Sequence, residues 1–326
     1  MRRHLAARTG RYLLTCIAVL LVHFSLPRMM PGDPIVHIIG AEDYYRYPKL
    51  AARLQEKFGI DQPLHVQFAR YVQMLARADL GHSFHYNRPV TETVMRRLKW
   101  TLVLVLPALA LGAAAAAVLG AVAGWHRGRA WERLLTVGCL LLKSVPQYGV
   151  AILALVFLSY ELRLFPLGGI GSTAAGGLRD ALGTAWHAAL PVLVLSVFNI
   201  AQYYMVLRND VADIKNRPFI VTARSRGLSE RAVLWRHAVR NALPPFTTML
   251  GLGLGFSVSG ALLVEIVFSW PGMGTLILTA VDNRDYPLLQ ACLLVLTLSV
   301  LVANYCVDLI NGLCDPRVRQ SRGESP

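Results

Sequence analysis

The chain has 326 residues, of which 55% are hydrophobic and 16% charged, and its mean hydropathy is +0.45, which excludes an ordinary soluble domain and favours a protein that crosses a membrane several times. A net charge of +14 would suit nucleic-acid binding in a soluble protein. In a membrane protein, however, excess arginine is expected in cytoplasmic loops, so we expect no nucleic-acid partner.

Six stretches are apolar and long enough to cross a hydrocarbon core about 30 Å thick. They are residues 9–29, 100–124, 134–160, 186–207, 246–269 and 288–311. The first resembles a secretory signal peptide, but no small-residue cleavage site follows it, so we expect an uncleaved first helix. The predicted fold class is therefore all-α and polytopic, with six transmembrane helices.

The positions of arginine and lysine predict the orientation of these helices. Arginine is abundant before the first span, between the second and third, in residues 208–245, and after the sixth, whereas the loops 161–185 and 270–287 hold three arginines between them. The positive-inside rule then predicts that both termini are cytoplasmic. A basic cluster at Arg96, Arg97 and Lys99 opposes this orientation, but long external segments follow the rule poorly.

Residues 30–99 are too long for a simple turn between two spans. They contain an apolar helical stripe from Leu64 to Leu75, so we expect a small external segment between the first and second helices. The chain then divides into a cytoplasmic N-terminus with the first helix at 1–29, the external segment at 30–99, a membrane core of five helices at 100–312, and a cytoplasmic tail at 313–326.

Glycine and proline recur inside the predicted spans. The pairs Gly120 with Gly124 and Gly251 with Gly255 have the four-residue spacing that lets helices approach closely, although ordinary glycine content of membrane helices explains them equally well. Prolines at 107, 146 and 191 favour kinks, which either line a transport pathway or only bend structural helices.

The stretch 208–245 is strongly basic and separates the fourth and fifth spans. Gly227 can take the left-handed conformation that ends a helix, and Ser229 can cap the next one, so we predict a helix, a turn and a second helix. Pro244 and Pro245 are expected to end that second helix. A solvated loop that only fixes the topology is the alternative, but a rigid amphipathic knob suits docking on a partner better.

The knob carries a family resemblance. The sequences TARSRGLS at 222–229 and RHAVRNALPP at 236–245 resemble the EAA loop of ABC importer permeases in the oligopeptide, dipeptide and nickel transport family. Further matches to the B-type subunit of that family are PGDP at 31–34, FGIDQPL at 58–64, ADLGHSF at 78–84, RPV at 88–90, EIVFSWPGMG at 265–274, DYPLLQA at 285–291 and DPRVR at 315–319.

The resemblance implies a type I ABC importer permease in a prokaryotic inner membrane. It implies four kinds of partner: a second homologous permease, two P-loop ATPase subunits, an extracytoplasmic solute-binding protein and the lipid bilayer. This chain has no GxxxxGK[ST] phosphate loop, so we expect ATP and Mg to be bound by the partner ATPase, with no cofactor and no enzyme activity in this chain.

The resemblance also assigns residues that couple the permease to its ATPase. They are Thr222, Ala223, Arg224, Gly227, Leu228, Ser229, His237, Arg240, Asn241 and Pro245. Val221 stands where the family motif has its name-giving acidic residue, so a contact through a glutamate at this position is in doubt.

Three residues are candidates for the transport pathway or its gate: Glu265, Pro146 and Gln147. Glu265 is an acid inside a span, where charge is costly, but we expect it first of all to cap and orient the WPGMG turn that follows. His82 and His85 form an H-x-x-H pair, but no third ligand is evident, so we predict no metal site.

Short peptides are the solute that the resemblance favours first. Nickel or a metal chelate, glutathione-like thiols and sugars remain open. Outside the class of ATP-driven ABC transporters, an intramembrane hydrolase would need catalytic groups, and a proton-coupled carrier would need several buried ionisable residues in mid-span. The sequence lacks these patterns.

Overall fold

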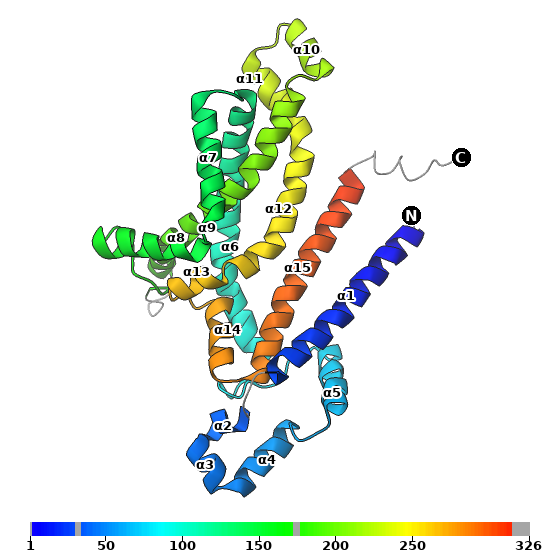
Figure 1. Cartoon of the computed structure of the whole chain (residues 1–326), viewed down its shortest axis with the longest axis vertical. Coiled ribbons are helices and arrows are strands. Elements are labelled where there is room, and N and C mark those ends of the chain that lie inside the picture. Colours follow the sequence, from blue (N-terminus) through cyan, green and yellow to red (C-terminus); the bar gives the residue numbers. More distant parts are fainter. Residues whose placement is uncertain (1, 30–33, 172–176, 315–326) are drawn as a thin grey trace. The chain divides into compact units, whose positions relative to one another are not determined.

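The computed structural model describes residues 2–29, 34–171 and 177–314 (Figure 1). Within these ranges the secondary structure is helical without a strand, apart from one isolated antiparallel bridge between His82 and Pro89. The all-α prediction is confirmed. The chain forms two compact units, one built from residues 1–100 and 271–299 and the other from 101–270 and 300–326.

Three of the described helices are long and apolar enough to cross a membrane: α6 (Val90–Trp125), α9 (Leu178–Ile214) and the Tyr286–Tyr305 part of α15 (Tyr286–Cys314). A fourth crossing results if the bent helices between Ala130 and Glu161 are taken together. This apolar helical content agrees with a polytopic membrane protein.

The third predicted span is not one helix, contrary to the sequence prediction for 134–160. It consists of α7 (Ala130–Ser144), α8 (Gln147–Ala154) and the π-helical η1 (Leu155–Glu161), with a bend of 100° between the two halves. Pro146 causes the break because it lacks an N–H donor and forces the preceding Val145 into an extended conformation, with φ −95° and ψ 136°. By contrast, α6 and α9 continue through Pro107 and Pro191.

The fifth predicted span also differs from its prediction. Its main helix, α12, runs over Arg240–Gly260 and is followed by the short α13 (Leu262–Val267). The expectation that Pro244 and Pro245 end the preceding helix is wrong, because α12 continues through both. A proline φ is compatible with a helix, and two missing N–H donors were not enough to stop it at this point.

The first unit contains the N-terminal helices together with α14 (Met273–Asp282) and the first part of α15. Its N-terminal helices are α1 (Arg2–Arg28), α2 (Pro34–Ile39), α3 (Ala41–Arg46), α4 (Pro48–Phe58) and α5 (Leu64–Ala76). Phe24 of α1 packs against Phe68 and Tyr71 of α5, with ring centroids 5.1 and 5.9 Å apart. Two members of the predicted apolar stripe of α5 thus contact α1, whereas Leu64 and Val72 of the same stripe are exposed.

A buried carboxylate joins two distant segments of the first unit. Asp285, just before α15, accepts hydrogen bonds from the Ser83 hydroxyl and from the backbone N–H groups of His85 (3.0 Å) and Leu288 (3.2 Å). Two sequence motifs about 200 residues apart, ADLGHSF and DYPLLQA, therefore meet at one polar joint. Because all three of these partners are hydrogen-bond donors, the buried carboxylate is stabilised as an acceptor.

The second unit is built around α9, which packs against both α7 and α12 (Figure 1). Its core is formed by α6, α7, α9, α12 and the helices between α9 and α12, with Tyr203, Tyr204 and Leu207 of α9 fully buried in it. Figure 1 shows α10 and α11 at one end of this helix group.

Close contact between α6 and α9 depends on glycine. A Cβ at Gly120 would lie 2.9 Å from the carbonyl oxygen of Tyr204, and one at Gly124 would overlap the carbonyl oxygen of Arg208. The close-approach reading of Gly120 and Gly124 is confirmed, because only glycine lets the two backbones touch. The side-chain surroundings of residues 255–260, which include Gly255 of the second pair, lie outside the described part.

Candidate functional site

The basic stretch between α9 and α12 forms the predicted helix, turn and helix. Its first helix, α10 (Pro218–Ser225), begins with proline at the first helical position, where no N–H donor is needed. The second begins as α11 (Glu230–Ala232), where the Ser229 hydroxyl accepts a hydrogen bond from the Ala232 N–H at 3.3 Å. From here on, the name knob is kept for residues 218–239, the part of this stretch from α10 to the end of the π-helical segment that follows α11.

Gly227 forms the turn of the knob in the left-handed region, with φ +78°. A Cβ at this position would meet no atom within 4 Å, so the surroundings leave space for a side chain. Glycine is therefore required by the backbone conformation, which costs about 1 to 2 kcal/mol for most other residues.

Trp125, the last residue of α6, anchors the knob to the membrane helices. Its indole Nε1–H donates to Glu230 Oε2 at 3.1 Å, and its backbone carbonyl accepts from Lys215 Nζ at 2.6 Å. The Arg224 guanidinium and the Lys215 ammonium lie 5.2 and 5.5 Å from the centroid of the Trp125 ring, within cation–π range. Trp125 thus contacts both helices of the knob, through Arg224 of α10 and Glu230 of α11.

Glu230 is the centre of this anchor. Arg224 donates to it through Nε at 2.8 Å and Nη2 at 3.1 Å, in the two-point geometry that suits a guanidinium and a carboxylate. The hydrogen bonds and charge of Arg224, helped by Trp125 and Lys215 and opposed by partial burial, lower the pKa of the Glu230 carboxyl. The carboxylate stays 61% exposed, so its electrostatic contribution is screened by solvent.

The knob has one apolar face turned inward and another turned outward. The inward side chains belong to the core of the second unit: Ile220, Ala223, Val233, Leu234, Ala238 and Val239. The outward face exposes Phe219, Val221, Leu228 and Trp235, each with roughly two fifths or more of its surface accessible. Exposed apolar side chains on a rigid, charged element are typical of a protein-binding surface.

The helix after the turn is wound as a π-helix. The segment η2 (Val233–Val239) follows α11 directly and leads without interruption into α12. Wide π turns inside helices are rare and occur frequently at functional sites. The knob is consequently continuous with a membrane helix on this side.

A buried ion pair lies between α7 and α9. Glu132 of α7 accepts from Arg208 Nε of α9 at 2.9 Å, from the Gly128 N–H at 3.0 Å and from the Thr136 hydroxyl at 3.0 Å. The Glu132 side chain is 1% exposed and that of Arg208 13%. Thr136 also hydrogen-bonds the Tyr204 hydroxyl at 2.9 Å, so the pair belongs to a satisfied polar network.

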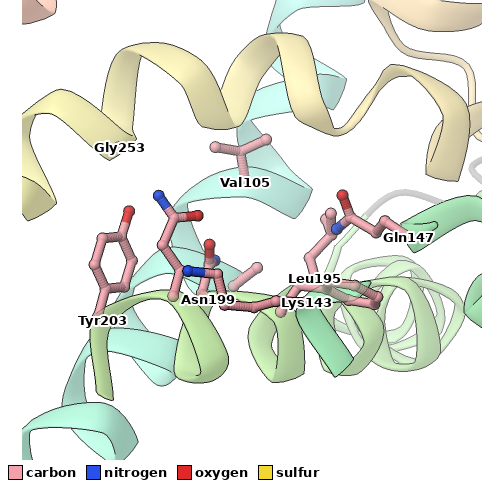
Figure 2. Close-up of a pocket in the computed structure, with 10 residues that line it drawn as sticks. Val105, Lys143, Gln147, Leu195, Asn199, Tyr203 and Gly253 are labelled. Atoms are coloured by element: carbon pink, nitrogen blue, oxygen red, sulfur yellow. The ribbon is translucent and has the colours of Figure 1, made fainter. Parts of the chain in front are cut away.

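A cavity of about 330 Å³ lies among the helices of the second unit (Figure 2). Its lining comprises Val105, Ala108, Lys143, Gln147, Leu195, Phe198, Asn199, Gln202, Tyr203 and Gly253. These residues come from α6, α7, α8, α9 and α12, and the break at Pro146 lies between Lys143 and Gln147. A volume of this size is in the range of small-molecule sites.

Two protein-family models match the sequence of this chain. Residues 116–320 match the family described as "binding-protein-dependent transport system inner membrane component". Residues 1–105 match the family of N-terminal regions of the membrane components of such systems. The chain belongs to this permease family. The resemblance to ABC importer permeases is thereby confirmed, and the family is one of transport proteins, not enzymes.

Two relatives resemble this permease over almost its full length. The di/tripeptide transport system permease protein DppB of Pseudomonas aeruginosa (strain UCBPP-PA14) is 30% identical over 341 residues, covering 99% of this chain and all of the relative. The glutathione transport system permease protein GsiC of Salmonella paratyphi A (strain ATCC 9150 / SARB42) is 32% identical over 306 residues, covering 94% of this chain and 95% of the relative.

The structure brings most of the predicted coupling residues together on the knob. Thr222, Arg224, Leu228 and Ser229 lie on or beside its turn, and the Ala223 side chain is buried beneath it. His237 lies in η2 at the end of the knob, and Arg240, Asn241 and Pro245 follow in the first turns of α12.

The candidates for the pathway occupy different places in this permease. Gln147 lines the cavity and Pro146 is the N-cap of α8 beside it. Glu265 is fully buried in α13 and is absent from the described lining of the cavity.

Sequence reasoning missed Trp125, Glu132 and Lys143. Trp125 and Glu230 are 105 residues apart, and Glu132 and Arg208 are 76 apart, so no local pattern pairs them. The available signal for the second pair was an acid, Glu132, and an arginine, Arg208, at the ends of two neighbouring predicted spans. Among the described residues, no group of three or more histidine, cysteine, aspartate or glutamate side chains is arranged to hold a metal ion.

Proposed function

We propose that this permease is one of two homologous membrane subunits of an ATP-driven importer for short peptides. Two P-loop ATPase subunits would bind and hydrolyse ATP with Mg, and an extracytoplasmic binding protein would deliver the solute. The full-length similarity to a di/tripeptide permease protein supports peptides over nickel, metal chelates and sugars. Glutathione, itself a short peptide, fits the same solute class.

The knob carries the proposal. It is a rigid element that connects two long helices, its inner face is packed in the core, and its outer face exposes Phe219, Val221 and Trp235. We assign the coupling role to residues 208–245, in which the exposed apolar face docks into a cleft of the ATPase. Movement of the ATPase would then pass to α6 through Trp125 and to α12 through the continuous helix after Ser229.

The same proposal fixes the topology. The chain would cross the inner membrane six times with both termini in the cytoplasm, the segment 30–99 outside, and the tail 313–326 inside. The bent third crossing and the interrupted fifth would each count as one passage. Residues 315–326 of the tail lie outside the described part of the chain.

The test is ATP-dependent uptake by the complete complex, purified from its native membrane and placed in proteoliposomes with the binding protein. Gly227→Val should lower peptide uptake per ATP hydrolysed while the amount of membrane-inserted permease stays the same, because a β-branched residue is strained at φ +78°. Gly227→Asn is the matched control, since asparagine tolerates this conformation and should keep coupling.

Two outcomes contradict different parts of the proposal. Uptake by Gly227→Val equal to that of the wild type would refute the coupling role of the turn. A wild-type complex that hydrolyses ATP but takes up no di- or tripeptide would refute the assignment of peptides as the solute.

A further inference from the structure

The cavity of the second unit has several polar side chains in an otherwise apolar lining. Four of its lining residues carry hydrogen-bonding side chains without charge, Gln147, Asn199, Gln202 and Tyr203, and the amides among them can both donate and accept. Figure 2 shows Gln147, Asn199 and Tyr203 with Lys143 around one space. Amides in this number match a solute that itself carries amide groups.

Lys143 gives the cavity its charge. Of the described residues that line the cavity, Lys143 alone is ionisable to a cation and none carries a carboxylate. Within the described part of the chain, the Lys143 ammonium forms neither an ion pair nor a hydrogen bond with another residue. The cavity therefore presents one uncompensated positive charge, which attracts an anionic group.

The position of Lys143 along α7 would make a purely structural role for its charge energetically costly. Lys143 is an exposed residue that lies ten residues beyond Arg133 on α7, about 15 Å along the helix. With Arg133 at the cytoplasmic membrane edge, as in the proposed topology, this distance is about half of a 30 Å hydrocarbon core. Asn199, on the same cavity, lies near the middle of the long helix α9. Ionisable residues at such depth usually face a pathway for ions or solutes.

Asn199 is held in place by the neighbouring helix. A Cβ at Gly112 of α6 would overlap the Cβ of Asn199, so the two helices touch at this point. On the other side, Tyr203 packs directly on Gly253 of α12, where a Cβ would overlap its hydroxyl. The polar side chains of α9 thus lie on a rigid wall formed by tightly packed helices.

We propose that this cavity is a solute subsite in the permease itself, in which Lys143 binds a carboxylate of the solute and Gln147, Asn199 and Gln202 bind its amide groups. The proposal rests on the proposed function, because the chemical class it selects is a short peptide with a free C-terminal carboxylate. It places part of the solute selection in the permease, in addition to the binding protein.

The experiment compares uptake of one tripeptide and of its C-terminal amide by the complex in proteoliposomes, both at concentrations that saturate the binding protein. Lys143→Met should lower uptake of the free acid about tenfold, the loss of one charge-assisted contact, and should leave uptake of the amide within about twofold of the wild type. Lys143→Arg keeps the positive charge and should retain most of the free-acid uptake. Lys99→Met removes a lysine that is absent from the cavity and should change neither rate.

Three results would overturn the inference. Free-acid uptake by Lys143→Met equal to the wild type would show that the cavity does not select the carboxylate. An equal loss for acid and amide, or an equal loss in Lys143→Met and Lys143→Arg, would assign Lys143 to packing or assembly. Wild-type complex without peptide uptake would instead refute the proposed function, so the two failures are distinguishable.

Discussion

Removing the buried carboxylate of Glu132 should open the packing between α7 and α9. In Glu132→Ala, the Arg208 side chain, 13% exposed, loses its partner, and the Gly128 N–H and the Thr136 hydroxyl lose an acceptor. Leaving one charge of a buried ion pair without its partner costs about 3 to 5 kcal/mol. The exposed pair of Arg127 and Asp213, with a 4.0 Å separation, is worth at most about 1 kcal/mol.

Cys139 provides the assay, because this thiol is buried on α7 two turns beyond Glu132 and belongs to the same core. Labelling by a maleimide needs local opening, so the labelling rate reports the equilibrium population of the open form when opening is fast. A destabilisation of about 3 kcal/mol should raise the rate about a hundredfold. Mass spectrometry of peptides separates Cys139 from the other cysteines.

The control is Asp213→Ala, which removes the exposed pair and should change the Cys139 labelling rate by less than about fivefold. In the double variant Glu132→Ala with Arg208→Ala, no buried charge is left over, so the labelling rate should be lower than the product of the two single effects predicts. A Glu132→Ala rate no higher than that of Asp213→Ala would refute the argument that this pair holds the helices together.

Two further predictions concern packing and pH. Gly253→Ala should lower the stability of the solubilised permease by about 1 to 3 kcal/mol, because the added Cβ overlaps the buried Tyr203 hydroxyl. Gly138→Ala is the control and should leave the stability unchanged, because its Cβ would meet no atom within 4 Å. Equal melting temperatures for the two variants would contradict the close packing at Gly253. Because the pKa of Glu230 is lowered in the folded state, its contribution to stability is complete above the ordinary carboxyl pKa of 4.5 and is lost as the pH falls through the folded-state pKa. The difference in melting temperature between wild type and Glu230→Gln should therefore be small and constant from pH 8 to pH 5.5. A difference that declines between pH 8 and pH 6 would contradict that direction.

Local signals in the sequence were sufficient for the turn of the knob. A glycine with positive φ and a capping serine act within three residues, so Gly227 and Ser229 could be assigned correctly. The same local reasoning failed at Pro244 and Pro245, where packing of α12 in the core keeps the helix continuous. Proline weakens a helix locally, but tertiary contacts decide whether the helix ends.

Long-range partners were beyond the reach of sequence patterns. A kink at Pro146 was predictable, but a bend of 100° depends on where the neighbouring helices leave space for α8. Likewise, the sequence alone gives no reason to single out Lys143 at the end of a helix. Its importance follows from the cavity, to which α9 contributes Asn199 and Gln202. The positions of these groups follow from the packing of helices, which one chain segment cannot specify.

The length of α9 has a consequence for where the ATPase would meet the permease. Its 37 residues span about 55 Å, which exceeds the 40 to 45 Å of a bilayer with its headgroups. A helix that crosses the membrane in full therefore has two or more turns left over. If the surplus lies at the end that leads into α10, the knob stands clear of the lipid headgroups, and a soluble protein can bind its outward-facing side chains without touching the bilayer.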